Sequence, residues 1–240
     1  MELSDYLDGA SDEYVDYARE AGADLTEQYH PPLVCNLGDL HSNFKNWISA
    51  KRNDIEQHCV KVQPYHRGET LTGSRLPSTV GYDEHNTKYF MSRDPEIKLL
   101  LGGREGFEKM GMQYEHSLCT LLITPPGSTI PWHSDTMQNW RDQNADINPH
   151  LVMAGEKAAH GLTYEQAHAG SQSDIGQVAR RIIAVTPWHW GHFIEMKSTF
   201  ITDWESGDVW NSPPCVWHLT GNAGVTLRIS VTVTGVEIAD

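Results

Sequence analysis

The most regular alternation of apolar and polar residues lies near the C-terminus of the chain. Between residues 226 and 234 the apolar set is Leu227, Ile229, Val231 and Val233, and the polar set is Thr226, Arg228, Ser230, Thr232 and Thr234. Successive side chains of a β-strand point to opposite faces of a sheet. The pattern therefore predicts a strand with one apolar and one polar face.

Shorter apolar runs, separated by turn residues, occupy the rest of the second half. The run at 116–124 ends at Pro125-Pro126-Gly127. The other runs lie at 131–135, 181–185, 193–196, 207–210 and 216–218. Many short strands with turns between them are typical of an antiparallel sandwich or barrel.

The first half carries helical periodicity instead. Apolar residues recur at spacings of three and four over 11–28, 40–55 and 94–110, and Gly102-Gly103 interrupts the last of these. The stretch 64–93 shows no sustained period and predicts loops or short strands, a candidate substrate lid, and 141–177 is a polar insert between the strands of the second half. We therefore expect a mainly β core with flanking helices.

The length and net charge of the chain restrict its number of domains and its partners. The 240 residues fit one domain, 1–240, with a helical and loop region (1–112) packed on a β core (113–240). A net charge of −14 argues against nucleic acid and anionic membranes as partners. No apolar run approaches the roughly 18 residues of a membrane span, and the four cysteines are too widely spaced for a disulfide framework. These features predict a soluble, cytoplasmic protein.

Candidate metal ligands lie in the predicted strands. His133 and Asp135 are two residues apart, so a strand places both on one face, and His218 in a later strand is the natural third ligand. Two imidazoles and one carboxylate on one face of an octahedron leave positions open for other ligands, which suits non-haem Fe(II) and O₂. We therefore treat these three residues as candidate catalytic, metal-binding residues.

Arg228 and Ser230 share the polar face of the last strand. If that face lines a barrel interior, the guanidinium needs an anionic partner, because an unpaired buried charge costs several kcal/mol. A ligand carboxylate matches the planar fork of arginine, and the Ser230 hydroxyl can add a hydrogen bond. The pair is a candidate site for a dicarboxylate whose other end reaches the metal.

Together, His133-x-Asp135, His218 and Arg228-x-Ser230 resemble the H-x-D…H…R-x-S pattern of the Fe(II)/2-oxoglutarate-dependent oxygenases. The likeness covers residues 117–235 and includes a Gly-Asp turn within 204–210. It implies a double-stranded β-helix (jelly-roll) core, iron on His133, Asp135 and His218, and the far carboxylate of 2-oxoglutarate on Arg228 and Ser230. It also implies that 2-oxoglutarate and O₂ are consumed with release of succinate and CO₂.

The resemblance implies a hydroxylase, since related halogenases replace the carboxylate ligand that this chain keeps as Asp135. Desaturation, epoxidation and cyclisation use the same three ligands and stay open. The first expectation is hydroxylation of a small metabolite or amino-acid derivative. The alternatives are a hydroxylase of protein or peptide side chains, and a cupin-like binding protein without turnover. Substrate, oxidised position and oligomeric state are not assigned.

Other interpretations of these residues compete with an iron site. His133 and Asp135 could form an ordinary hydrogen-bonded pair, and Arg228 could lie on a solvated strand face. His189, His192 and Glu195 form a rival metal cluster, although Pro187 and Gly191 indicate a turn there. Five tryptophans near the predicted site form either an aromatic cage or ordinary core: Trp132, Trp140, Trp188, Trp190 and Trp217.

Overall fold

The computed structural model describes residues 30–61, 88–133, 137–147, 169–196, 199–212 and 218–239. The helix expected over 11–28 and most of the candidate lid, 64–93, lie outside these ranges, as does most of the polar insert at 141–177. Within them the chain is mainly β, with two antiparallel sheets and short helices.

The larger sheet has the strand order β1-β10-β7-β12-β4-β3-β2, with β6 paired to β7. Its strands are β1 (Leu33–Asn36), β2 (Cys59–Lys61), β3 (Lys88–Ser92), β4 (Leu118–Thr124), β6 (Gln172–Ser173), β7 (Gly176–Ala184), β10 (Asp208–Asn211) and β12 (Arg228–Val236). Every pairing between them is antiparallel.

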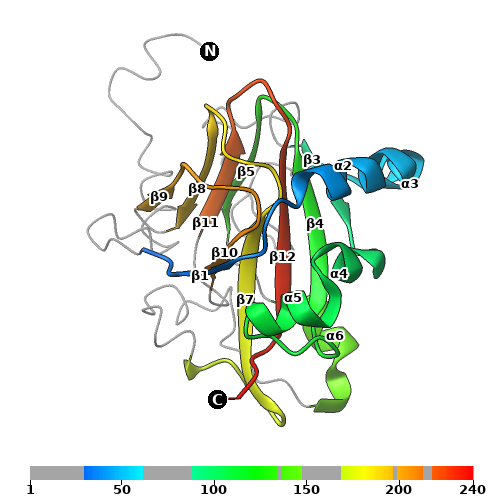
Figure 1. Ribbon diagram of the computed structural model, residues 1–240, viewed down its shortest axis with the longest axis vertical. Coiled ribbons are helices and arrows are strands. Elements are labelled where there is room, and N and C mark those ends of the chain that lie inside the picture. Colours follow the sequence, from blue (N-terminus) through cyan, green and yellow to red (C-terminus); the bar gives the residue numbers. More distant parts are fainter. Residues whose placement is uncertain are drawn as a thin grey trace, which may run out of the picture.

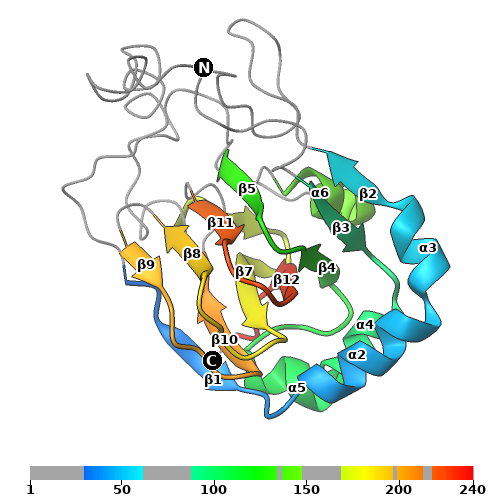
Figure 2. The same ribbon diagram turned by 90° about the horizontal axis from the view of Figure 1, so that it is seen from above.

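The smaller sheet has the order β5-β11-β8-β9 and faces the larger one (Figures 1 and 2). Its strands are β5 (Ser128–His133), β8 (His192–Met196), β9 (Thr199–Ile201) and β11 (His218–Asn222). From β4 to β12 the chain passes repeatedly between the sheets, so that β10-β7-β12-β4 oppose β5-β11-β8-β9. This order is that of a double-stranded β-helix, which confirms the predicted jelly-roll core.

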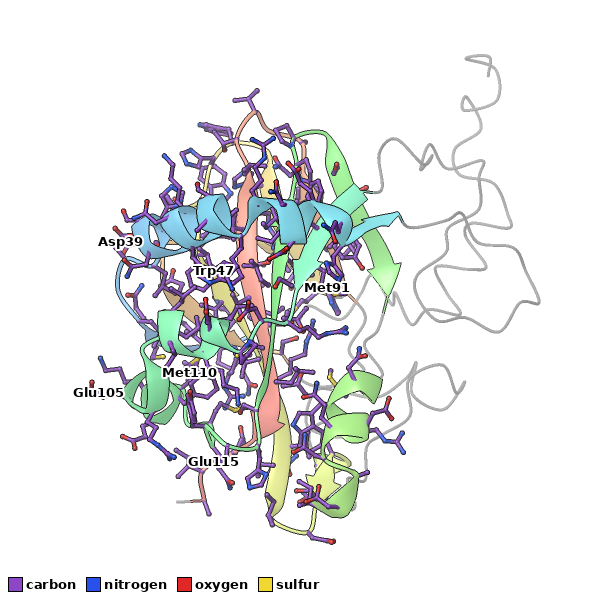
Figure 3. The ribbon with its side chains drawn as sticks, turned by 90° about the vertical axis from the view of Figure 1, so that its right-hand side faces the viewer. Asp39, Trp47, Met91, Glu105, Met110 and Glu115 are labelled. Carbon is purple, nitrogen blue, oxygen red and sulfur yellow. The ribbon has the colours of Figure 1, made fainter. Side chains whose placement is uncertain are left out.

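The helices cover the outer face of the larger sheet, as Figures 2 and 3 show. They are α2 (His41–Ala50), α3 (Arg52–Gln57), α4 (Glu96–Leu100) and α5 (Gly103–Lys109), whereas α6 (Gln138–Gln143) and the 3₁₀ turn η3 (Ala145–Ile147) lie beyond β5 in the chain. The predicted break is present, since Gly102 separates α4 from α5 with a φ of 93°, which glycine adopts without steric cost.

Strand β12 is buried on both faces, which explains why its polar positions are not solvated. Ile229, Val231 and Val233 belong to the main hydrophobic core beneath the helices, which also contains Phe44 of α2 and Phe107 of α5. On the opposite face Arg228 and Ser230 point between the sheets and are buried. The alternative in which Arg228 lies on a solvated face is therefore wrong.

Three strands from the first 112 residues extend the larger sheet; β3 lies in the stretch predicted as loops or short strands, whereas β1 and β2 were not predicted. β1 pairs with β10 at one edge, and β2 and β3 continue the sheet beyond β4. Strands of three to five residues contain too few positions to establish a period of two, and their apolar residues resemble those of loops. The N-terminal region thus supplies part of the sheet as well as its covering helices.

The turn before β10 confirms the structural role expected for Asp208. Its carboxylate accepts hydrogen bonds from the Glu205 amide at 2.9 Å and the Asn36 side chain at 2.8 Å. Gly207 precedes it at a φ of 89°, and a Cβ there would lie 2.1 Å from the Gly38 carbonyl oxygen. Only glycine allows this close approach between the turn and the chain after β1.

No helix in the described ranges is long and apolar enough to cross a membrane. Cys35 and Cys119 are free thiols.

Candidate functional site

A cavity of about 320 Å³ lies between the two sheets. Its walls come from the inner face of the larger sheet and from β5 and β11 of the smaller sheet. On β12 the four residues of the polar set from Arg228 to Thr234 all line it, which are Arg228, Ser230, Thr232 and Thr234. The alternation identified in the sequence therefore separates the cavity from the core.

The backbone brings two of the predicted metal ligands opposite each other. His133 ends β5, His218 begins β11, and their Cα positions are partners in the antiparallel ladder. The His218 side chain is buried and lines the cavity. Asp135 and the side chain of His133 lie outside the described part of the chain. The structure thus shows two predicted positions meeting at the cavity, while the full ligand set stays a prediction.

Arg228 is a buried cation with unused hydrogen-bond donors. Its side chain is 2% exposed, and within the described structure its Nε and Nη1 atoms have no hydrogen-bond partner. The guanidinium carbon lies 5.7 Å from the centre of the Trp204 ring, whose negative face attracts a cation. Burial lowers the pKa of Arg228 to about 10, so the group remains charged at neutral pH. An anion bound in the cavity would supply a partner for these donors.

Neighbouring hydroxyls add donors to the same cavity. Ser230 is buried and lines the wall two residues beyond Arg228. Thr220, two residues beyond His218 on β11, also lines it, and its buried hydroxyl lacks a hydrogen-bond partner among the described residues. Thr220 was not predicted, although its spacing of two from His218 places both on one face of a strand. Together with Arg228, these hydroxyls can bind carboxylate oxygens.

Arg180 is a second buried cation, which the sequence analysis did not identify. It lies on β7, and its Nη1 atom is 3.2 Å from the Ser212 hydroxyl and 3.5 Å from Nε2 of His218. The adjacent Arg181 points to the other face, where its guanidinium binds Met110, Asn211 and Glu237. Two consecutive arginines in an apolar strand lie on opposite faces, so this pair was a signal in the sequence that could have indicated one inward cation.

The rival cluster of His189, His192 and Glu195 does not form a metal site. No group of three metal-ligating side chains is present among the described residues, and these three are all described. His192 is buried while Glu195 lies on the other face of β8. His192 does not line the cavity, since its ring stacks on Trp204 at 6.4 Å and its Nε2 is 3.2 Å from the Thr226 carbonyl oxygen.

Acidification is expected to destabilise the protein through His192. Burial, and to a smaller extent the charge of Arg228, lowers the pKa of His192 below its ordinary value, whereas the Thr226 carbonyl opposes this. Below about pH 6.5 the unfolded histidine gains a proton more readily than the folded one, so the free energy of unfolding decreases. Denaturant titrations from pH 7 to pH 5 should show a larger decrease in the free energy of unfolding for the wild type than for His192→Gln. Equal decreases would contradict this assignment.

The five tryptophans do not form a common cage in the described structure. Trp140 alone of the described members lines the cavity, and its Nε1 donates to the His116 carbonyl oxygen at 2.7 Å. Trp188 packs against a small core with Trp204, and Trp190 is 85% exposed. The side chains of Trp132 and Trp217 lie outside the described residues. The described tryptophans therefore serve mainly as core and surface residues.

The described cavity residues His218 and Arg228 suit the metal ion and the dicarboxylate that the sequence pattern implies. The imidazole of His218 is buried, and the backbone position of His218 is paired with that of His133. This arrangement suits a metal ion, since neutral imidazole is a common ligand of iron. The Nε and Nη1 donors of Arg228, which no described residue accepts from, suit one carboxylate of a dicarboxylate. The cavity thus offers a candidate ligand and a carboxylate anchor in one enclosed space.

Comparison with known proteins identifies distant structural neighbours. No family model and no curated protein matches the sequence. A prolyl-4-hydroxylase from Pseudomonas putida is 14% identical, with coverage of 92% of this chain and 98% of that one and a TM-score of 0.41. An alpha-ketoglutarate-dependent epimerase of nogalamycin biosynthesis is 9% identical, with coverage of 93% and 83% and a TM-score of 0.44.

A predicted oxalate decarboxylase from Thermotoga maritima is 12% identical, with coverage of 62% of this chain and 81% of that one and a TM-score of 0.31. Cupin-domain proteins are also among the neighbours. The neighbours therefore include an alpha-ketoglutarate-dependent epimerase, a prolyl-4-hydroxylase and cupin proteins. At these TM-scores the fold assignment depends on the strand order of the chain itself, and the activity depends on its own site.

Proposed function

We propose that this protein is an Fe(II)- and 2-oxoglutarate-dependent dioxygenase that hydroxylates a small molecule. The observation that carries the proposal is Arg228, a fully buried cation that lines the cavity and whose Nε and Nη1 donors have no hydrogen-bond partner among the described residues. A protein retains such a group at a cost of several kcal/mol, and a bound carboxylate removes that cost. The spacing of Arg228 from His218 matches the sequence pattern that suggested this class.

In this proposal His133, Asp135 and His218 hold the iron. When bound, iron with 2-oxoglutarate and O₂ supplies the oxidising power to convert a C–H bond to C–OH, with release of succinate and CO₂. Arg228 binds the far carboxylate of 2-oxoglutarate, assisted by the hydroxyls of Ser230 and Thr220. Trp204 keeps the guanidinium in place, since its own Nε1 donates to the Thr186 carbonyl oxygen at 3.0 Å.

The size of the cavity limits the substrate to a small metabolite or amino-acid derivative, or to a single side chain of a larger molecule. About 320 Å³ is at the lower end of the range for ligand pockets and must hold both 2-oxoglutarate and the substrate. A cupin-like protein without turnover would explain a metal site but leaves the buried charge of Arg228 unexplained. The free thiols of Cys35 and Cys119 agree with the reducing cytoplasm, where we place the protein.

An anaerobic titration tests the proposal. Metal-free protein receives Fe(II) and then 2-oxoglutarate, and a visible charge-transfer band is expected when the co-substrate chelates the metal. The band should be absent from His218→Ala and should need much more 2-oxoglutarate in Arg228→Gln. Binding of Fe(II) without any band at saturating 2-oxoglutarate would refute the oxygenase and favour the binding protein.

A further inference from the structure

The cavity contains more positive charge than the co-substrate requires. Arg93 and Arg180 line it as well as Arg228, and none of its described lining residues is Asp or Glu. The whole chain carries 32 acidic against 18 basic residues, so this local excess of cations opposes the overall charge. Clefts lined by one sign of charge concentrate ligands of the opposite sign.

The register of the sheet separates these cations. Arg180 is opposite Thr234, six residues along β12 from Arg228. Ser92 of β3 pairs with Leu121 of β4, so the next residue, Arg93, is level with Thr120. Thr120 pairs with Thr232 of β12, which is four residues from Arg228. At a rise of about 3.3 Å per residue, these levels lie roughly 13–20 Å from that of Arg228. One carboxylate bound at Arg228 therefore leaves the other end of the cavity without an anion.

Arg93 is the cation available at that second end. It follows β3, whose residues Tyr89 and Met91 line the same wall, and Met91 is marked in Figure 3. Its side chain is exposed, and no hydrogen bond or ion pair occupies its guanidinium in the described structure. Arg180 already binds Ser212 and lies beside His218, so it adds positive charge nearer the predicted iron.

We infer that the substrate is an anion whose carboxylate or phosphate group binds Arg93 at the rim of the cavity, with Arg180 stabilising the charge further in. This inference rests on the proposed function, because it assigns Arg228 to 2-oxoglutarate and leaves Arg93 for the substrate. The guanidinium fork of Arg93 matches either oxyanion through paired N–H donors. The carbon to be hydroxylated then lies between this anchor and the iron.

Matched charged and neutral probes test the inference. Benzoate, phenyl phosphate and benzamide are titrated into anaerobic protein loaded with Fe(II) and saturating 2-oxoglutarate, and binding is followed by the tryptophan fluorescence, to which Trp140 in the cavity wall contributes. Both anions should bind about tenfold more tightly than benzamide, and Arg93→Gln should remove about that factor for the anions only. Arg104→Gln, an exposed arginine of α5 outside the cavity, is the matched control and should behave like the wild type.

Three results would overturn the inference: equal binding of benzamide and benzoate, the same anion affinity in Arg93→Gln and Arg104→Gln, or no anion binding to loaded protein. Circular dichroism of each variant shows whether the fold is retained. The charge-transfer band is recorded in the same samples. If the band is absent, the oxygenase proposal has failed, and the same three probes with metal-free protein still decide whether Arg93 selects anions.

Discussion

Substitution of His218 by alanine is expected to abolish Fe(II)-dependent succinate formation while the fold remains intact. Loss of residues that merely support a ligand typically costs 10–100-fold in metal affinity or activity, so loss of a direct ligand should cost about 1,000-fold or more. The fold should survive because His218 lines a cavity and is not part of a hydrophobic core cluster. Bound iron and succinate are measured after purification under nitrogen.

The matched control is His58→Ala, which removes an exposed imidazole near the end of α3 and should retain full turnover. His133→Ala and Asp135→Ala should behave like His218→Ala. Undiminished succinate release in any of the three would show that the residue is not a ligand. Loss of activity accompanied by an altered circular dichroism spectrum would count as a folding effect, and metal affinity of the refolded variant would then decide.

Substitution of Arg228 by methionine is expected to stabilise the ligand-free protein and to eliminate 2-oxoglutarate binding. The methionine keeps most of the side-chain length but removes a buried charge whose Nε and Nη1 lack a hydrogen-bond partner in the described part of the chain. Replacing buried charges by apolar groups commonly adds about 1–4 kcal/mol to the free energy of unfolding. Denaturant titrations at pH 7 measure this change. Saturating 2-oxoglutarate at 100 times its Kd should stabilise the wild type by about 2.7 kcal/mol and leave the variant unchanged.

Arg181 provides the contrasting case on the neighbouring strand. It is as buried as Arg180, but its donors reach the Met110 carbonyl at 3.2 Å, Asn211 at 2.7 Å and Glu237 at 2.8 Å. Arg181→Met leaves these acceptors unpaired and should destabilise the protein by about 3 kcal/mol. If Arg228→Met unfolds as early as Arg181→Met, or still binds 2-oxoglutarate, Arg228 has a structural role and the assigned anchor is wrong.

The sequence predicted those parts of the fold in which many positions share one pattern. Strand β12 and the helices around Phe44 and Phe107 each contain several apolar residues at a fixed spacing, so periodicity alone located them. The polar face of β12 was visible too, but alternation cannot tell a solvated face from one that lines a cavity. Arg228 is buried because the smaller sheet lies over this face, and the sequence of β12 alone does not encode that packing.

The remaining features depend on contacts between distant parts of the chain. β1 and β3 form strands because their backbones pair with β10 and β4. Their own sequences show no alternation of apolar and polar residues that would predict a strand. Arg180 became a site residue through its approach to Ser212 and His218, from segments more than 30 residues away. The arginine pair could indicate an inward cation, but no local pattern encodes its approach to Ser212 and His218, so the surroundings of Arg180 could not be predicted.

The two buried faces of β12 also bear on how new substrate preferences could arise. From Arg228 to Thr234 the residues of this strand alternate between the cavity and the core under the helices, so a shift of the strand that reshapes the pocket also displaces the core. β3 lies farther out in the sheet, and the residue that follows it, Arg93, is exposed. Directed evolution for altered selectivity should therefore accumulate tolerated changes around β3 and leave β12 almost untouched, which separates an adaptable wall of the pocket from an invariant one.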